Sequence, residues 1–116
     1  MVKPSLDEYI ERELTAVTAM TAAGDADGAF RHLERAHVLG QASTYQHTRV
    51  HMLMLSHGLR QRDRKEIAGQ LLRIGGAATK TPLGIYPKGN TGGANVNPLR
   101  SMPIETDLAE ILAENK

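Results

Sequence analysis

All five histidines of the chain fall between positions 32 and 57, and this clustering points most directly to chemistry. His47 and His51 are four residues apart, a spacing that places both imidazoles on one face of a helix. Glu34 and His37 have the Glu-x-x-His spacing that di-iron and di-manganese helical bundles use. In both pairs, residues that can bind metal are spaced so that their side chains lie on one face of a helix.

The two pairs are expected to meet, because only the short turn 40–43 separates their helices and such neighbours pack antiparallel. His37 lies near the end of one helix and His47 near the start of the next. We predict a metal site made by Glu34, His37, His47 and His51. Three imidazoles and one carboxylate suit zinc, iron or copper, and are too rich in nitrogen for magnesium or calcium.

Other uses of these residues stay open. His51 and Met54 could share a copper(I) ion, although Met54 also fits a core position. Tyr45, His47 and Glu34 could form an acid–base relay without a metal. Haem with His47 or His51 as axial ligand is a further alternative, which the low aromatic content of 3% makes less natural.

Two neighbours are predicted to orient the ligands, and two histidines are expected to lie outside the site. Gln41 or Tyr45 would hydrogen-bond to the metal-binding side chains. His32 and His57 are expected to face solvent at least in part.

Four helical segments must position these side chains, since apolar residues recur at three and four positions along each of them. Ser5, Ser43 and Asp63 each stand three residues before Glu or Gln, the spacing of a capping box or a related arrangement. The predicted helices are 5–23, 26–39, 44–61 and 64–74. Glycines are expected to end the helices, as Gly24, Gly40 and the pair Gly75-Gly76, and Ile67, Leu71 and Ile74 are expected to form the apolar stripe of the fourth helix.

The fold class is therefore all-α, with a four-helix region over 5–78 in a single domain, 1–116. Four consecutive helices predict two antiparallel hairpins. Their inner turns, near Gly24-Asp25 and Arg62-Asp63, are 38 positions apart, a spacing close to that of tetratricopeptide-like repeats.

The rest of the chain differs in composition, since residues 79–104 are rich in Gly, Pro and Asn and have no helical period. We predict an ordered strap that crosses the hairpins and is pinned by a short helix at 105–114. Its apolar residues are expected to anchor it: Ile85, Tyr86, Val96, Leu99 and Met102. A small molecule or peptide could bind beneath the strap, which could also act as a lid over the histidines.

Composition removes several classes of function. The chain has no cysteine, which excludes disulfides, thiolate catalysis and iron–sulfur clusters. A net charge of +1 and no aromatic residues within the basic stretch 60–65 argue against nucleic acid. No apolar run is long enough to cross a membrane and no secretory signal is evident, so we expect a cytoplasmic protein, with a homodimer as an open option.

The chain also resembles a known family in several separated strings. They are His-Leu-Glu-Arg-Ala-His-Val-Leu-Gly-Gln at 32–41, His47-x-x-x-His51-Met-Leu-Met-Leu, Gly-Asn-Thr-Gly-Gly-Ala-Asn-Val at 89–96, and Met-Pro-Ile at 102–104 followed by Asp107-Leu108. Together these resemble a small bacterial family known as domain of unknown function 3703, over about residues 29–112. The resemblance implies a compact bacterial domain in which the histidines and the strap belong to one design, and it implies no activity.

Two functions of different kinds remain. The first is a small metal-binding helical protein with its His/Glu site between the second and third helices, either catalytic or serving to sense or carry the metal. The second is a non-enzymatic helical-hairpin interaction module, in which the histidines form a structural network. Metal content of the purified protein distinguishes the two.

Overall fold

The computed structural model describes residues 3–115, and these contain helices and no strand. The elements are α1 (Leu6–Ala22), α2 (Ala26–Gly40), α3 (Thr44–Gln61), α4 (Arg64–Lys80), the 3-10 helix η1 (Thr81–Leu83) and α5 (Thr106–Glu114). The all-α prediction is thereby confirmed for the described chain.

The first four helices begin where short polar side chains cap them. Ser5, Asp25, Ser43 and Asp63 each accept a hydrogen bond from the backbone N–H three residues on. Each cap satisfies one of the N–H groups that a helix leaves without a partner in its first turn. These starts depend only on neighbouring residues, which explains why the sequence predicted them closely.

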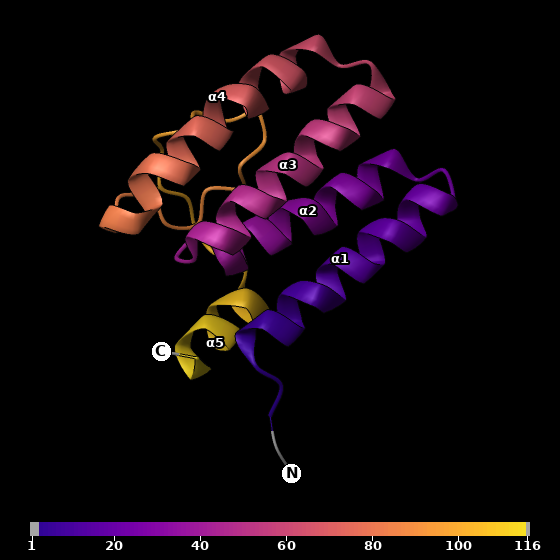
Figure 1. Cartoon of the computed structure of the whole chain (residues 1–116). Helices are drawn as coiled ribbons and strands as arrows, with labels where there is room; N and C mark the ends of the chain where they lie inside the picture. Colours follow the sequence, from indigo (N-terminus) through magenta and orange to yellow (C-terminus); the bar gives the residue numbers. More distant parts are fainter. Residues whose placement is uncertain (1–2, 116) are drawn as a thin grey trace.

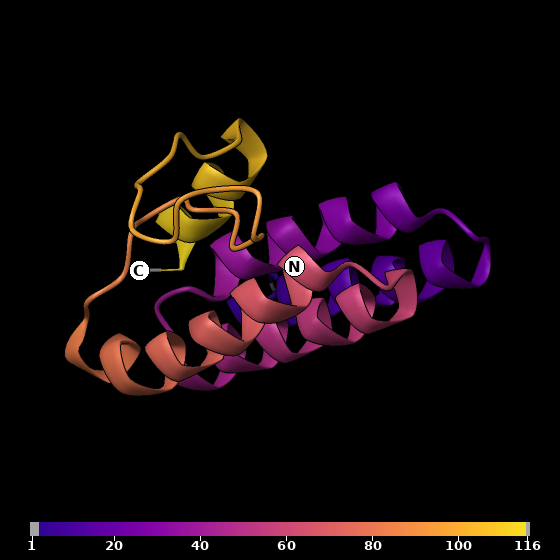
Figure 2. The same ribbon diagram turned by 90° about the horizontal axis from the view of Figure 1, so that it is seen from above.

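Consecutive helices alternate in direction, as Figure 1 shows for α1 to α4. α1 packs on α2, α2 on α3, and α3 on α4. The connecting segment (residues 84–105) and α5 lie together on one side of this helical array (Figure 2). α5 contacts α2, so the end of the chain returns to the second helix.

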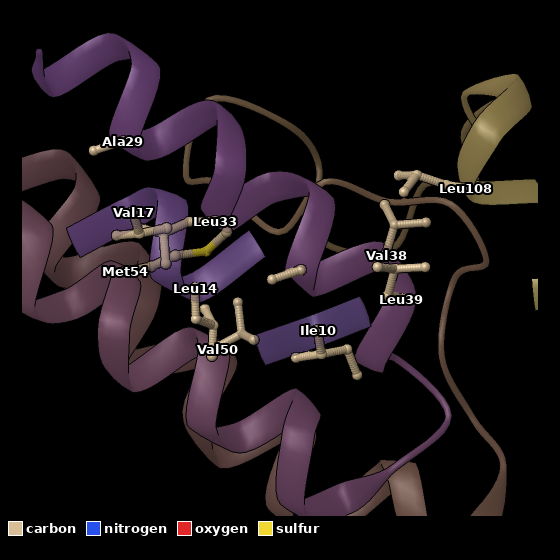
Figure 3. Close-up of a cluster of buried hydrophobic side chains, with 11 residues drawn as sticks. Ile10, Leu14, Val17, Ala29, Leu33, Val38, Leu39, Val50, Met54 and Leu108 are labelled. Carbon is tan, nitrogen blue, oxygen red and sulfur yellow. The ribbon is translucent and has the colours of Figure 1, made fainter. Parts of the chain in front are cut away.

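The hydrophobic core lies between α1, α2 and α3 (Figure 3). Leu33 of α2 and Met54 of α3 are fully buried in it, and Ile10 of α1 is almost fully buried. Leu108 adds α5 to the same core. α4 contributes no residue to this cluster, which leaves its inner face free for polar side chains.

An ion-pair network fixes α5 to α2. The Arg35 guanidinium donates to Glu13 of α1 at 3.0 Å, to Glu105 at 2.6 Å and to Asp107 at the start of α5. One cation thus joins three segments that are far apart in the sequence. This arrangement supports the position of the connecting segment, whose far end is Glu105.

Two predicted helix ends are wrong. Gly40 is the last helical residue of α2 rather than a left-handed residue after it, and a Cβ there would lie 2.9 Å from the Gln46 Cβ. α4 passes through Gly75 and Gly76 and ends at Lys80. Neither glycine has a positive φ, and without that conformation glycine only weakens a helix instead of ending it.

The predicted apolar stripe of α4 is also wrong. Leu71 is exposed, and Ile67 and Ile74 are only half-buried. The buried residues of α4 are instead Glu66, Gln70 and Ala77, because this helix faces a polar site and the connecting segment.

The connecting segment is held by polar contacts and by part of its predicted apolar anchors, since Tyr86, Val96 and Met102 are half-buried. Ile85 and Leu99 are exposed, contrary to their predicted role as anchors. The side chain of Gln41 instead donates to the Pro87 carbonyl at 2.7 Å and accepts from the Gly89 N–H at 2.8 Å. Arg73 donates to the Val96 carbonyl at 2.8 Å.

Among the described helices, none is long and apolar enough to span a membrane.

Candidate metal centre

Three histidines meet in the interior, and we refer to His37, His47 and His51 as the His triad. His37 lies on the last turns of α2, and the other two lie one turn apart on α3. One ligand nitrogen from each lies within 4.8 Å of the others, and all three residues are buried. Their ring centroids are 4.6 to 4.9 Å apart.

The Nδ1 atom of each imidazole is already bonded on its outer side. His37 Nδ1 lies 2.7 Å from the Asn90 carbonyl oxygen, and His51 Nδ1 lies 2.6 Å from the Gln70 Oε1. His47 Nδ1 lies 2.7 Å from the Thr81 hydroxyl. Outer hydrogen bonds of this kind fix the ring orientation and the tautomer of metal-binding histidines.

These partners determine where two of the protons lie. A backbone carbonyl only accepts hydrogen bonds, so His37 must carry its proton on Nδ1. The Gln70 amide nitrogen donates to Glu66 and to the Gly92 carbonyl, which turns its oxygen toward His51. His51 therefore also carries its proton on Nδ1, and the Nε2 atoms of both rings are left with lone pairs.

Those lone pairs face each other across a short distance. The Nε2 atoms of His37 and His51 are 3.0 Å apart, a hydrogen-bond distance with no proton available on either nitrogen. A cation bound between the two nitrogens would make this contact favourable. In a tetrahedral metal site with ligands at 2.0–2.1 Å, two nitrogens stand roughly 3.3 Å apart, close to the separation observed.

The imidazoles are neutral at ordinary pH. Burial lowers the pKa of His47 to about 4. Burial, aided by the neighbouring His47, also lowers the pKa of His51 to about 4. Burial and the two adjacent imidazoles hold the pKa of His37 well below its usual value. Neutral imidazole is the form that binds metal, so the site needs no proton removed before an ion enters.

A second layer of bonds connects the triad to the connecting segment. Glu66, which binds Gln70, also accepts from the Ala94 N–H at 3.1 Å. The Asn90 side chain accepts from the Gly92 N–H and donates to the carbonyls of Asn97 and Arg100. The segment is therefore folded around groups that also orient the imidazoles.

Gly92 lies directly on the His37 ring. Its φ is +86°, and a Cβ there would come within 2.6 Å of the ring carbon Cδ2. Only glycine fits this close approach in a left-handed conformation.

The triad borders a pocket of about 850 Å³ between α4 and the connecting segment. Gly75 and Gly76 of α4 line it, and a Cβ at either position would meet no atom within 4 Å. On one side of the three imidazoles, the Nδ1 atoms are hydrogen-bonded to the protein. The same imidazoles also line the pocket.

The four predicted ligands do not all come together. Glu34 is half-buried, one turn before His37, and does not belong to the group of ligand atoms that meets at the triad. Burial raises the pKa of its carboxyl group. The structure thus brings together three of the four residues that the spacing predicted.

The other predicted residues agree with expectation only in part. Tyr45 is 69% exposed and does not orient the imidazoles, while Gln41 is buried but binds the connecting segment. Met54 is a core residue whose sulfur accepts from Gln70. His32 is half-buried against Glu13, as expected, but His57 is buried beside Phe30, contrary to expectation.

Sequence reasoning missed the residues that orient the rings: Gln70, Thr81 and Asn90. They lie 19, 34 and 53 positions from the histidines they contact, so no local spacing reveals them. Glu66 and Gln70 are four positions apart, which places both polar side chains on one face of α4. This shared polar face is the signal that could have found Gln70.

Comparison with known proteins places the chain in a family and gives no activity. A search of curated proteins and a search of solved structures each found no match. A family model described as "Protein of unknown function (DUF3703)" matches residues 4–112, nearly the whole chain. The chain therefore belongs to the DUF3703 family.

Proposed function

We propose that the protein binds one divalent transition-metal ion through the Nε2 atoms of His37, His47 and His51. The observation that carries this proposal is the 3.0 Å contact between two Nε2 atoms whose protons are committed to Nδ1. Three neutral imidazoles suit zinc, iron or copper, and the described triad offers neither the thiolates nor the oxygen ligands that other ions prefer.

The donor set favours a site that uses its metal over one that is purely structural. A metal with three histidine ligands and an open fourth position polarises a bound molecule or lowers the pKa of a bound water. The residues of this chain supply the rest: Gln70, Thr81 and Asn90 orient the rings, and the connecting segment acts as an ordered strap beside the pocket. Catalysis and metal sensing or carriage both fit this arrangement.

The test is metal binding by the purified untagged protein. Zinc and cobalt(II) should each bind with a stoichiometry of one in a calorimetric titration, and cobalt(II) should give visible bands characteristic of nitrogen coordination. His47→Gln and His51→Gln should lower the affinity at least tenfold with an unchanged circular dichroism spectrum. His32→Gln is the matched control, because His32 binds Glu13 outside the triad. Unchanged affinity in both triad variants would refute the site.

A second candidate is the interaction module with a structural His network. It is favoured by the way His37 and His47 hold Asn90 and Thr81 in place, which would stabilise the fold without any ion. In this reading α1–α2 and α3–α4 are two tetratricopeptide-like hairpins that present a binding surface. The same titration separates the candidates, because a purely structural network predicts no stoichiometric binding of zinc or cobalt(II).

A further inference from the structure

The pocket beside the His triad has an apolar rim built from α4 and from two places in the connecting segment. Leu72 of α4 is 71% exposed, and Ile85 and Leu99 of the connecting segment are 58% and 76% exposed. All three line the same pocket. Large apolar side chains are costly to leave in water, and their convergence on one opening indicates a surface that an apolar group covers.

The charges that line the pocket all have the same sign. Arg73 and Lys80 are lining residues, and no Asp or Glu lines the pocket among the described residues. Neither cation takes part in an ion pair within residues 3–115. A pocket with unpaired cations and no carboxylate favours an anion over a neutral or cationic ligand.

Arg73 brings a fixed positive charge to the pocket, although its Nε atom is enclosed by protein. Its two terminal nitrogens donate to the carbonyls of Gly69 and Val96, so they hold the guanidinium in place. Its Nε is buried and has no hydrogen-bond partner among the described residues. Glu66, the carboxylate whose charge acts on Arg73, is already bonded to Gln70 and Ala94.

We propose that this pocket binds a small organic anion with an apolar tail. The anionic group lies at the inner end, toward Arg73 and the His triad, and the tail lies along Leu72, Ile85 and Leu99. The volume of about 850 Å³ falls within the range of pockets that hold small organic ligands. The inference rests on the proposed metal site for the contact of the anionic group with the ion, and on the protein alone for the rest.

Octanoate is the probe that tests this pairing of charge and apolar length. Calorimetric titration of the zinc-loaded protein should show octanoate binding at least tenfold more tightly than acetate, octanol or octylammonium. The comparison with acetate measures how much the apolar tail contributes to affinity, since each buried methylene raises affinity roughly fourfold. The comparison with octanol and octylammonium measures how much the negative charge of the ligand contributes to affinity. Equal binding of octanoate and any of these three compounds would overturn the proposal.

Surface variants locate the bound tail and keep the fold intact. Leu72→Ser and Leu99→Ser should each weaken octanoate binding three- to tenfold, while Leu59→Ser should leave it unchanged. Leu59 is a matched control because it is also exposed, on α3, and does not line the pocket. Lys80→Gln should weaken binding about threefold, and Lys65→Gln, an exposed lysine outside the pocket, should not. Loss that is equal in test and control variants would contradict the proposed location.

Titration of the metal-free protein separates this inference from the proposed function. If zinc fails to bind but octanoate binding responds to the leucine and lysine variants as described, the metal site fails and the pocket stands. If zinc binds with a stoichiometry of one and octanoate binds no better than octanol, the metal site stands and the pocket inference is overturned.

Discussion

The Nε2 atoms of His37 and His51 lie 3.0 Å apart in the protein interior, and each directs a lone pair toward the other. Both protons are held on the opposite nitrogen, by the Asn90 carbonyl and the Gln70 amide oxygen. Two acceptors in contact without a proton are unfavourable in a buried site, where the electrostatic interaction is only weakly screened. The fold thus maintains a contact that becomes favourable when a cation joins it.

Metal is therefore expected to stabilise the folded protein. Zinc at a free concentration 100 times its dissociation constant should raise the free energy of unfolding by about 2.7 kcal/mol, and the melting temperature by roughly 10 °C. Thermal denaturation followed by circular dichroism, with and without chelator, measures the shift. The double variant His47→Gln/His51→Gln should show no shift, and a wild-type protein that melts at the same temperature in both conditions would contradict the prediction.

Gln70→Leu tests the outer hydrogen bonds. The substitution removes the acceptor of the His51 N–H and also the donor to Gly92, so His51 loses its fixed orientation. We expect zinc affinity to fall 10- to 100-fold, the usual effect of removing such a partner. Calorimetric titration measures it, with the folded state checked by circular dichroism. Gln61→Leu, at the exposed end of α3, is the control and should retain full affinity.

Local signals predicted much of the fold. The capping side chains Ser5, Asp25, Ser43 and Asp63 act on residues three positions away, so the sequence alone locates the starts of four helices. The same holds for the triad, because helical spacing and a short turn suffice to bring its members to one end of α2 and α3. Both the caps and the triad depend on residues that are close in sequence, so their spacing suffices to predict them.

The features that were missed depend on contacts between distant segments. The inner face of α4 buries Glu66 and Gln70, which is favourable only because His51, Gly92 and Ala94 supply their hydrogen bonds. Periodicity of apolar residues cannot show this, since it assumes that a helix buries its leucines. Gly75 and Gly76 also remain within α4, since neither adopts the positive φ of a left-handed helix end.

The metal-free protein should lose stability as the pH falls below neutrality. The pKa of His47 and of His51 is lowered to about 4 in the folded state, whereas an unfolded histidine titrates near 6.5. Between these values the unfolded chain binds more protons than the folded chain, so the free energy of unfolding decreases from about pH 6.5 down to about pH 4. Each imidazole accounts for about 3 kcal/mol over the whole window.

Urea denaturation in the presence of chelator, at pH 7.5, 6.0 and 5.0, measures this loss. The variant His47→Gln/His51→Gln is the control, because it removes two of the groups that titrate and should show a much shallower dependence. A double variant that loses as much stability as the wild type would mean that other groups cause the loss.

Gly92→Ala should damage the site more than the same substitution at Gly84. Both glycines have a positive φ, +86° at Gly92 and +74° at Gly84, so alanine costs about 1 kcal/mol of backbone strain at either position. At Gly84 the new Cβ meets no atom within 4 Å, whereas at Gly92 it comes within 2.6 Å of the His37 ring. The steric conflict at Gly92 should cost a further 1–3 kcal/mol of folding stability, the usual range for overpacking.

The same conflict should also turn His37 away from the triad, so zinc affinity should fall at least tenfold in Gly92→Ala and stay unchanged in Gly84→Ala. Equal affinities in the two variants would show that the position of the His37 ring does not depend on the connecting segment.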